Sequence, residues 1–363
     1  MIAKFDQTGS VEKLELFLSE LESQEDVASI MILACDNNKF TKELVDPIIL
    51  DRQKPLFGGI FPEIIHNSAK FTTGTILVGI TSFTAVSIIH ELSNSNVDYE
   101  EYIDKAVPGS IQAETMFVFV DGLSKRISSF IDSLFNVFGL EMNFLGGGAG
   151  SLSFEQKPVL FSNQGLLEDA AIIALADVES GIGVKHGWFD VQGPYRVTKA
   201  ERNVIVSLDW KPAAEIYKSI VEPHSGNTLN TENFFDTSKG YPFGVSKLGS
   251  EKIVRDPISM LDDGSLVCVG EVPEDVFVHI LSGSTETLVQ AARAALKTGS
   301  DDLKQGVEKE AIFVIDCISR VLYLQDDFEA ELEAITIKGL PMIGALTLGE
   351  IANNGREYLE FYN

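Results

Sequence analysis

Cys317 and Arg320 are the pair of residues in this sequence whose types and spacing most clearly could do chemistry. They lie at the end of an apolar run, in the segment Ile-Asp-Cys-Ile-Ser-Arg. The ends of buried strands are where α/β sheets usually present functional groups. An arginine can bind a carboxylate through two hydrogen bonds and favours the thiolate form of a nearby cysteine. Two interpretations stay open: a ligand-binding pair, and a structural salt bridge of the arginine beside a core cysteine.

A second group of candidates follows nearer the C-terminus, in the motif Gly-x-x-Thr-x-Gly-Glu-Ile. Its candidate ligand-binding residues are Gly344, Thr347, Gly349 and Glu350. A carboxylate flanked by leucine and isoleucine is costly to bury alone. We therefore expect Glu350 to contact Arg320, the amine of a ligand, or backbone donors. An arginine and a glutamate in one pocket suit a zwitterionic ligand such as an amino acid.

A glycine run, Gly146, Gly147 and Gly148, follows a strand-like segment, where phosphate-binding loops begin. A P-loop would continue with Gly-Lys-Ser/Thr, whereas Ser-Leu-Ser follows here. A dinucleotide fingerprint needs a helix next, whereas residues 151–161 are predicted to form a turn and another strand. We expect the glycines to serve a turn or a close backbone approach, with a glycine-lined ligand pocket as the alternative. No cofactor is predicted.

Metal binding and catalysis find little support in the sequence. The five histidines show no His-x₃-His spacing and the three cysteines no Cys-x₂-Cys spacing, so no metal site is predicted. No Gly-x-Ser-x-Gly elbow is present. We predict no catalytic residue and no enzyme. The alternative is a hydrolase or transferase with Cys317 as its nucleophile, for which the sequence identifies no base.

The formal net charge of −26 excludes several partners. Nucleic-acid binding needs clustered lysine and arginine, and anionic membrane surfaces would repel this chain. No apolar run has the roughly 18 residues of a membrane span, and three cysteines in apolar runs do not indicate a disulfide framework. We expect a cytoplasmic protein. A further alternative is a scaffold whose acidic surface docks a basic protein.

The same order of elements recurs three times: strand, polar turn, helix, strand, glycine. It begins at residues 28–34, 115–120 and 311–315. The repetition predicts an α/β fold, with two packed α/β domains whose mixed sheets are built from β-α-β units. Alternating apolar residues in 195–208 predict an added antiparallel strand pair. A glycine-rich break places the boundary near residues 180–195, which gives domains at 1–185 and 186–363.

These motifs together resemble the FIST family, named for F-box and intracellular signal transduction. The resemblance spans nearly the whole chain, in the order of the family's paired N-terminal and C-terminal domains. Its most specific part is the Cys-x-x-Arg segment followed by the Gly-x-x-Thr-x-Gly-Glu-Ile motif. The segments that carry it are LFGGIF, FLGGGAGS, GWFDVQGPYRVTKAERNVIVSLDWKPAAEIY, IDCISR and GALTLGEIANNG.

The resemblance implies a sensory module that binds a small polar ligand, for which amino acids have been proposed, without enzymatic activity. No kinase, chemoreceptor or F-box segment accompanies the two domains here, so we expect output through a separate signalling partner. The oligomeric state is left open. Cys317 is expected to be partly exposed at the pocket wall and to react faster than Cys35 or Cys268.

Overall fold

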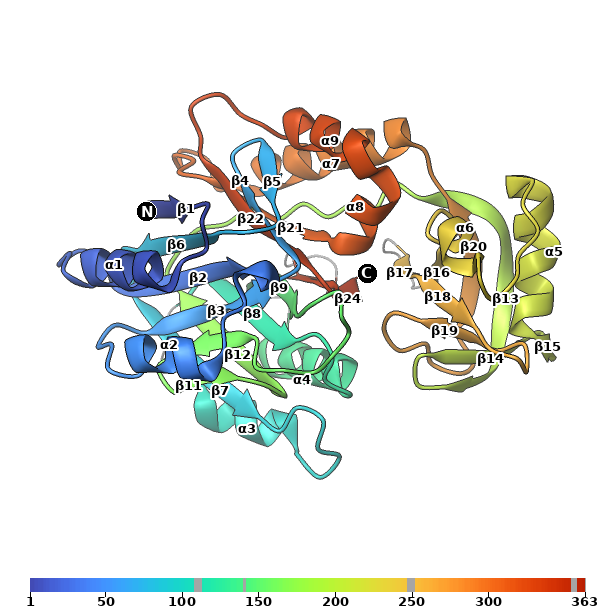
Figure 1. Ribbon diagram of the computed structural model, residues 1–363, viewed down its shortest axis with the longest axis horizontal. Helices are drawn as coiled ribbons and strands as arrows, with labels where there is room; N and C mark the ends of the chain where they lie inside the picture. Colours follow the sequence, from blue (N-terminus) through green and yellow to red (C-terminus); the bar gives the residue numbers. More distant parts are fainter. Residues whose placement is uncertain (108–112, 140–141, 247–251, 354–357, 363) are drawn as a thin grey trace. The chain divides into compact units, whose positions relative to one another are not determined.

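The computed structural model describes residues 1–107, 113–139, 142–246, 252–353 and 358–362 (Figure 1). Contacts divide the chain into two compact units. The first contains residues 1–183, 296–318 and 335–360, and the second is built mainly from residues 184–295 and 319–334. Two late segments, 296–318 and 335–360, pack with the N-terminal part of the chain.

The first sheet of unit 1 has a parallel pair at its centre and antiparallel strands on both sides. Helix α1 (Val11–Glu22) begins at Ser10, whose hydroxyl accepts from Lys13 N at 3.2 Å, and it buries three leucines. A 3₁₀ turn, η1 (Asp36–Asn38), and helix α2 (Lys42–Ile49) connect the parallel strands. In order across the sheet the strands are β1 (Ile2–Asp6), β6 (Thr75–Ile80), β2 (Ser29–Cys35), β3 (Leu56–Phe61), β10 (Leu160–Ser162) and β11 (Gly165–Leu167).

The second sheet of unit 1 repeats this plan. Its central parallel pair is connected by helix α4 (Ile127–Phe138), and helix α3 (Tyr99–Ala106) precedes the pair. In order the strands are β7 (Thr84–His90), β12 (Ala170–Ala176), β8 (Thr115–Asp121), β9 (Asn143–Ala149), β23 (Glu350–Asn353) and β24 (Tyr358–Tyr362). Position for position, the parallel pair β8–β9 corresponds to β2–β3 in the first sheet.

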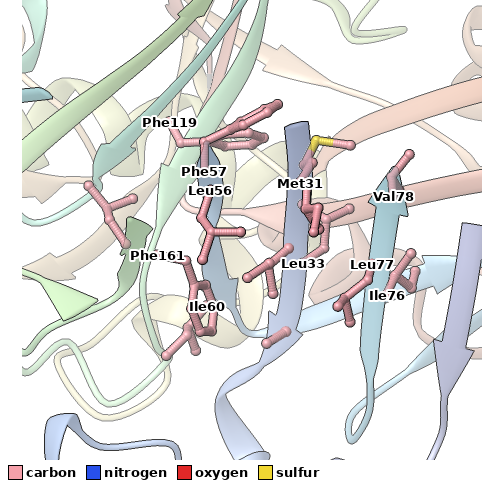
Figure 2. Close-up of a cluster of buried hydrophobic side chains, with 14 of the residues drawn as sticks. Met31, Leu33, Leu56, Phe57, Ile60, Ile76, Leu77, Val78, Phe119 and Phe161 are labelled. Carbon is pink, nitrogen blue, oxygen red and sulfur yellow. The ribbon is translucent and has the colours of Figure 1, made fainter. Parts of the chain in front are cut away.

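Aromatic side chains fill the space between these two sheets. The ring of Phe57 lies 5.7 Å from that of Phe117 and 6.4 Å from that of Phe119, and Phe61 lies 5.8 Å from Phe119. Figure 2 shows Phe57 of β3 beside Phe119, with Met31 of β2 next to them and Leu33 farther along the same strand. Burial of such rings is the main favourable term in folding, so the two sheets share one core.

A third, four-stranded sheet completes unit 1. Its strands, in order, are β21 (Ile312–Cys317), β22 (Met342–Thr347), β4 (Glu63–His66) and β5 (Ala69–Phe71). The first two are parallel and the others antiparallel. The connection between β21 and β22 runs through α8 (Ile318–Leu324), η2 (Gln325–Asp327) and α9 (Phe328–Ala334).

The three predicted β-α-β units are confirmed, and they share one register. In each parallel pair, an apolar residue of the first strand lies opposite a glycine of the second. The pairs are Ile32 with Gly58, Val118 with Gly146, and Val314 with Gly344. A Cβ added to these glycines would lie only 2.0, 1.8 and 2.0 Å from the carbonyl oxygen of the residue opposite. The recurring glycine therefore serves the close approach of two backbones.

Unit 2 is built on an antiparallel sheet, with Tyr217, Phe234 and Phe243 buried in its core. The antiparallel pair predicted within 195–208 is confirmed as β13 and β14. Helices α5 (Ala213–Ser225), α6 (Phe234–Ser238) and α7 (Thr285–Asp302) accompany the sheet. Its strands are β17 (Ile253–Arg255), β16 (Phe243–Val245), β20 (Phe277–Ser282), β13 (Phe189–Glu201), β14 (Val204–Leu208), β19 (Leu266–Cys268) and β18 (Pro257–Met260), with β15 (Lys211–Pro212) on β14. Among the described residues, no helix is both long and apolar enough to cross a membrane.

Candidate functional site

Several residues singled out from the sequence meet where strands of the second and third sheets end. Cys317 and Thr347 are partners at the last position of the parallel pair β21–β22. Glu350, which begins β23, is the antiparallel partner of Gly147. The backbones are joined by two hydrogen bonds, from Gly148 N to Gly349 O at 2.8 Å and from Leu348 N to Gly148 O at 2.9 Å. We call Cys317, Thr347, Gly349, Glu350, Gly147 and Gly148 the strand-end site.

The polar groups of the strand-end site centre on the buried hydroxyl of Thr347. Its Oγ1 lies 3.3 Å from the carbonyl oxygen of Asp316 and 3.4 Å from Oε1 of Glu350, and it accepts from Gly349 N at 3.4 Å. All three distances are long for hydrogen bonds. The Glu350 side chain is half-buried. A carboxylate has about four acceptor positions, so Glu350 can accept from a ligand amine in addition to its contacts within the protein.

The predicted glycines serve close backbone packing. Gly344 lies in the middle of β22, and both Gly344 and Gly146 are the glycines of the repeated register described above. A Cβ on Gly147 would lie 2.7 Å from Gly349 O and 2.9 Å from Cγ2 of Thr347. The close-approach interpretation therefore accounts for these glycines, and the chemical groups of the site are the thiol, the hydroxyl and the carboxylate.

Arg320 lies in unit 2, in a buried ion pair with Glu331 of α9. Its Nε donates to both Glu331 carboxylate oxygens, at 2.8 and 2.9 Å. Nη1 donates to the carbonyl of His186 at 2.6 Å and Nη2 to that of Leu288 at 2.7 Å. These contacts support the salt-bridge interpretation of Arg320.

Glu331 was not singled out from the sequence. The signal that identifies it is its position in α9, where it lies three residues after the buried Phe328 and next to the buried Leu332. An acidic residue on the apolar side of a short helix needs a buried cation. That reasoning points to a nearby arginine, and Arg320 is in the helix that precedes η2 and α9.

A further polar contact that the sequence did not reveal fastens residues 151–157 to the end of β2. Ser151 Oγ donates to Asp36 Oδ2 at 2.7 Å, and the ammonium of Lys157 binds Oδ1 of the same carboxylate. Burial raises the pKa of Asp36, but the hydrogen bonds from Lys157 and Ser151 outweigh it and hold that pKa below its usual range. One carboxylate thus joins the two ends of a short surface segment.

The thiol of Cys317 is less exposed than the sequence suggested. Only 5% of the residue is accessible, and Cys35 and Cys268 are fully buried. Burial raises the pKa of Cys35 to about 12 and raises that of Cys268 still further above its usual value. A thiol must ionise and be reached by solvent to react, so these two cysteines are inert in the folded state.

We expect Cys317 to be the first cysteine labelled when the folded protein is treated with iodoacetamide. Its residual accessibility and the raised pKa values of the other two thiols set this order. Mass spectrometry of the three cysteine-containing peptides over time gives the rates, and labelling in denaturant, where all three should react alike, is the control. Equal, slow labelling at the three positions would make Cys317 an ordinary core residue.

Metal coordination gains no support from the geometry. Within the described ranges, His, Cys, Asp and Glu side chains form no group of three that could hold a metal ion. His66, the last residue of β4, stacks on Phe5 with ring centroids 4.2 Å apart. The chemistry available at the strand-end site is therefore that of its thiol, hydroxyl and carboxylate.

Comparison with known protein families gives two matches in the order of the chain. Residues 30–211 match the FIST N domain, and residues 213–353 match the FIST C domain. A search of curated proteins found no significant match. The two domains together account for most of the sequence, and the strand-end site takes Gly147 and Gly148 from the first and its other residues from the second. The chain therefore belongs to the FIST family.

Proposed function

We propose that this protein is a sensor that binds a small, amino-acid-like metabolite and acts in signal transduction through a separate partner. FIST domains are associated with sensory signal transduction. The observation that carries the ligand proposal is the meeting of the Thr347 hydroxyl and the half-buried Glu350 carboxylate at the strand-end site. Strand ends are where α/β sheets commonly hold ligands.

The negative charge of the strand-end site favours the amine end of the proposed ligand. Among the residues that define the strand-end site, the charged group is the Glu350 carboxylate. A carboxylate binds an ammonium group through charge-assisted hydrogen bonds, which are about twice as strong as neutral ones. The proposed ligand is thus recognised through its amine, and Thr347 supplies a neutral hydrogen-bonding group beside it.

A thermal-shift screen with amino acids and related amines tests the proposal. A ligand at 100 times its Kd should raise the free energy of unfolding by about 2.7 kcal/mol. Glu350→Gln keeps the shape of the side chain but removes the charge, so it should abolish the shift. Glu25→Gln removes a charge from an exposed position of the same unit and serves as the matched control. An unchanged shift in Glu350→Gln would remove the strand-end site from consideration.

A further inference from the structure

In the third β-α-β unit, the described residues supply no counterpart to one strand that the other two units possess. In the first unit β2 is paired with β3 on one edge and with antiparallel β6 on the other, and in the second β8 is paired likewise with β9 and β12. The third unit has the same parallel pair, but β21 is the edge of its sheet, and no other described strand pairs with it. The internal repeat thus identifies what belongs beside β21: an antiparallel strand.

The equivalence of the units extends to individual hydrogen bonds. Ile30 N donates to Pro55 O at 2.9 Å in the first unit, and Ile312 N donates to Pro341 O at 2.9 Å in the third. Since successive residues of a strand direct their backbone groups to opposite edges, those of Phe313 and Ile315 point away from β22.

Phe313 and Ile315 correspond to Met31 and Leu33 in the first unit. Those two residues pair with Val78 and Ile76 of β6. For Phe313 and Ile315, the described part of the chain contributes no hydrogen-bond partner on this edge. Both residues are partly buried, and an added strand would supply hydrogen-bond partners to their outward backbone groups, as the folded interior usually does.

At Cys317, the last residue of β21, a side chain accepts the hydrogen bond that a neighbouring strand accepts in the first unit. In the first unit Cys35 N donates to the carbonyl of Gly74, just before β6, at 3.0 Å. At the equivalent position Cys317 N donates to the side chain of Asp316, at Oδ1 and 2.8 Å. A carboxylate of the edge strand itself thus takes the place of the neighbouring strand's carbonyl.

We propose that the open edge of β21 binds an extended segment of a partner protein as an added antiparallel strand. The bound segment would be apolar, because β6 and β12 fill the equivalent positions with Thr-Ile-Leu-Val-Gly-Ile and Ala-Ala-Ile-Ile-Ala-Leu-Ala. It would carry basic residues at its ends, because Asp316 lies near the end of β21 and Glu308 precedes the strand; Glu310, also before β21, is already ion-paired with the N-terminal ammonium of Met1 at 2.8 Å. Strand addition of this kind draws affinity from the backbone and specificity from alternate side chains.

Charge argues against a second copy of this chain as the occupant. In an antiparallel pair of β21 strands, Asp316 of one copy would lie toward the residues before β21 of the other, where Glu308 is exposed and Glu310 is ion-paired with Met1, and like charges near one another are destabilising. Each copy also carries a net charge of −26. A basic-flanked apolar strand meets no such repulsion. The inference rests on the proposed function only in that signalling requires a separate partner, and it does not depend on the ligand.

A fluorescent peptide with the sequence of β6, flanked by two lysines at each end, is the probe. We expect saturable binding in fluorescence anisotropy to the full chain without added ligand. Hydrogen exchange followed by NMR should show the Phe313 and Ile315 amides slowed at least about tenfold by the peptide, with Ile312 and Val314 unchanged because their amides already face β22. This alternation distinguishes strand addition from binding elsewhere.

Two changes remove the added hydrogen bonds. N-methylation of the peptide at its valine and first isoleucine should weaken binding at least about tenfold, because these residues correspond to Val78 and Ile76. Ile315→Pro removes an outward N–H from an edge strand, where proline is tolerated, and should have the same effect.

Each of three results would overturn the proposal: equal binding of the methylated peptide, an absence of saturation, or dimerisation that protects Phe313 and Ile315 without peptide. The methylated peptide keeps the test decisive even when the Ile315→Pro variant does not fold. Because no amino acid is added, the result is independent of the Glu350 test, and either proposal can fail without the other.

Discussion

Arg320→Ala should destabilise the folded protein by about 3–5 kcal/mol, the usual result of removing one partner from a buried ion pair. Arg320 and Glu331 are only 7% and 3% exposed, and the guanidinium also binds the carbonyls of His186 and Leu288. The variant removes the cation that binds the Glu331 carboxylate and the N–H donors that these two carbonyls accept from. The free energy of unfolding, measured by urea denaturation at neutral pH, gives the effect.

Two variants separate this effect from a general loss of positive charge. Arg196 forms an ion pair with Asp275 at 2.8 Å in the same unit, but both side chains are largely exposed, so Arg196→Ala should cost at most about 1 kcal/mol. The double variant Arg320→Met with Glu331→Leu removes both charges and should recover most of the stability. If Arg320→Ala keeps its stability but loses the thermal shift induced by amino acids, Arg320 instead binds the ligand, which is one of the two interpretations drawn from the sequence.

Gly146→Ala is expected to be the most damaging methyl addition in unit 1, at a cost of at least about 3 kcal/mol. The new Cβ would lie 1.8 Å from the carbonyl oxygen of Val118, at a φ of +158°. Since that oxygen belongs to the adjacent strand β8, the clash is relieved only by separating β8 from β9. Those strands are at the centre of the second sheet, so the cost falls on its core.

Gly306→Ala is the matched control for this substitution. Gly306 also has a positive φ, +92°, but no atom lies within 4 Å of its added Cβ. The control therefore reports the conformational cost alone, about 1–2 kcal/mol. Guanidinium denaturation of the two variants measures the difference. Equal losses of stability would show that backbone conformation, rather than the approach of β8 to β9, requires glycine at position 146.

Much of the fold is readable from the sequence, because its signals are local. Apolar runs at 28–34, 115–120 and 311–315 predict buried strands, and the glycines that follow mark the second strand of each unit. Parallel strands joined by a helix are the one arrangement that satisfies this order in a short length of chain. The sequence likewise determined the strand-end position of Cys317 and the packing role of the glycines.

Tertiary structure alone decided which of these signals meet. Thr347 and Glu350 follow one another closely in the chain, but their neighbour Gly147 is about two hundred residues away in sequence and is reached through sheet pairing. The chain has many acidic residues that could pair with Arg320, and the packing of unit 2 places Glu331 beside it. The sequence also does not reveal that no described strand pairs with the outer edge of β21, because the pattern at 311–315 is the same as at 28–34 and 115–120. Local patterns set what each segment becomes, whereas the partner of a side chain or a strand edge depends on long-range packing, which minimises the free energy of the whole chain.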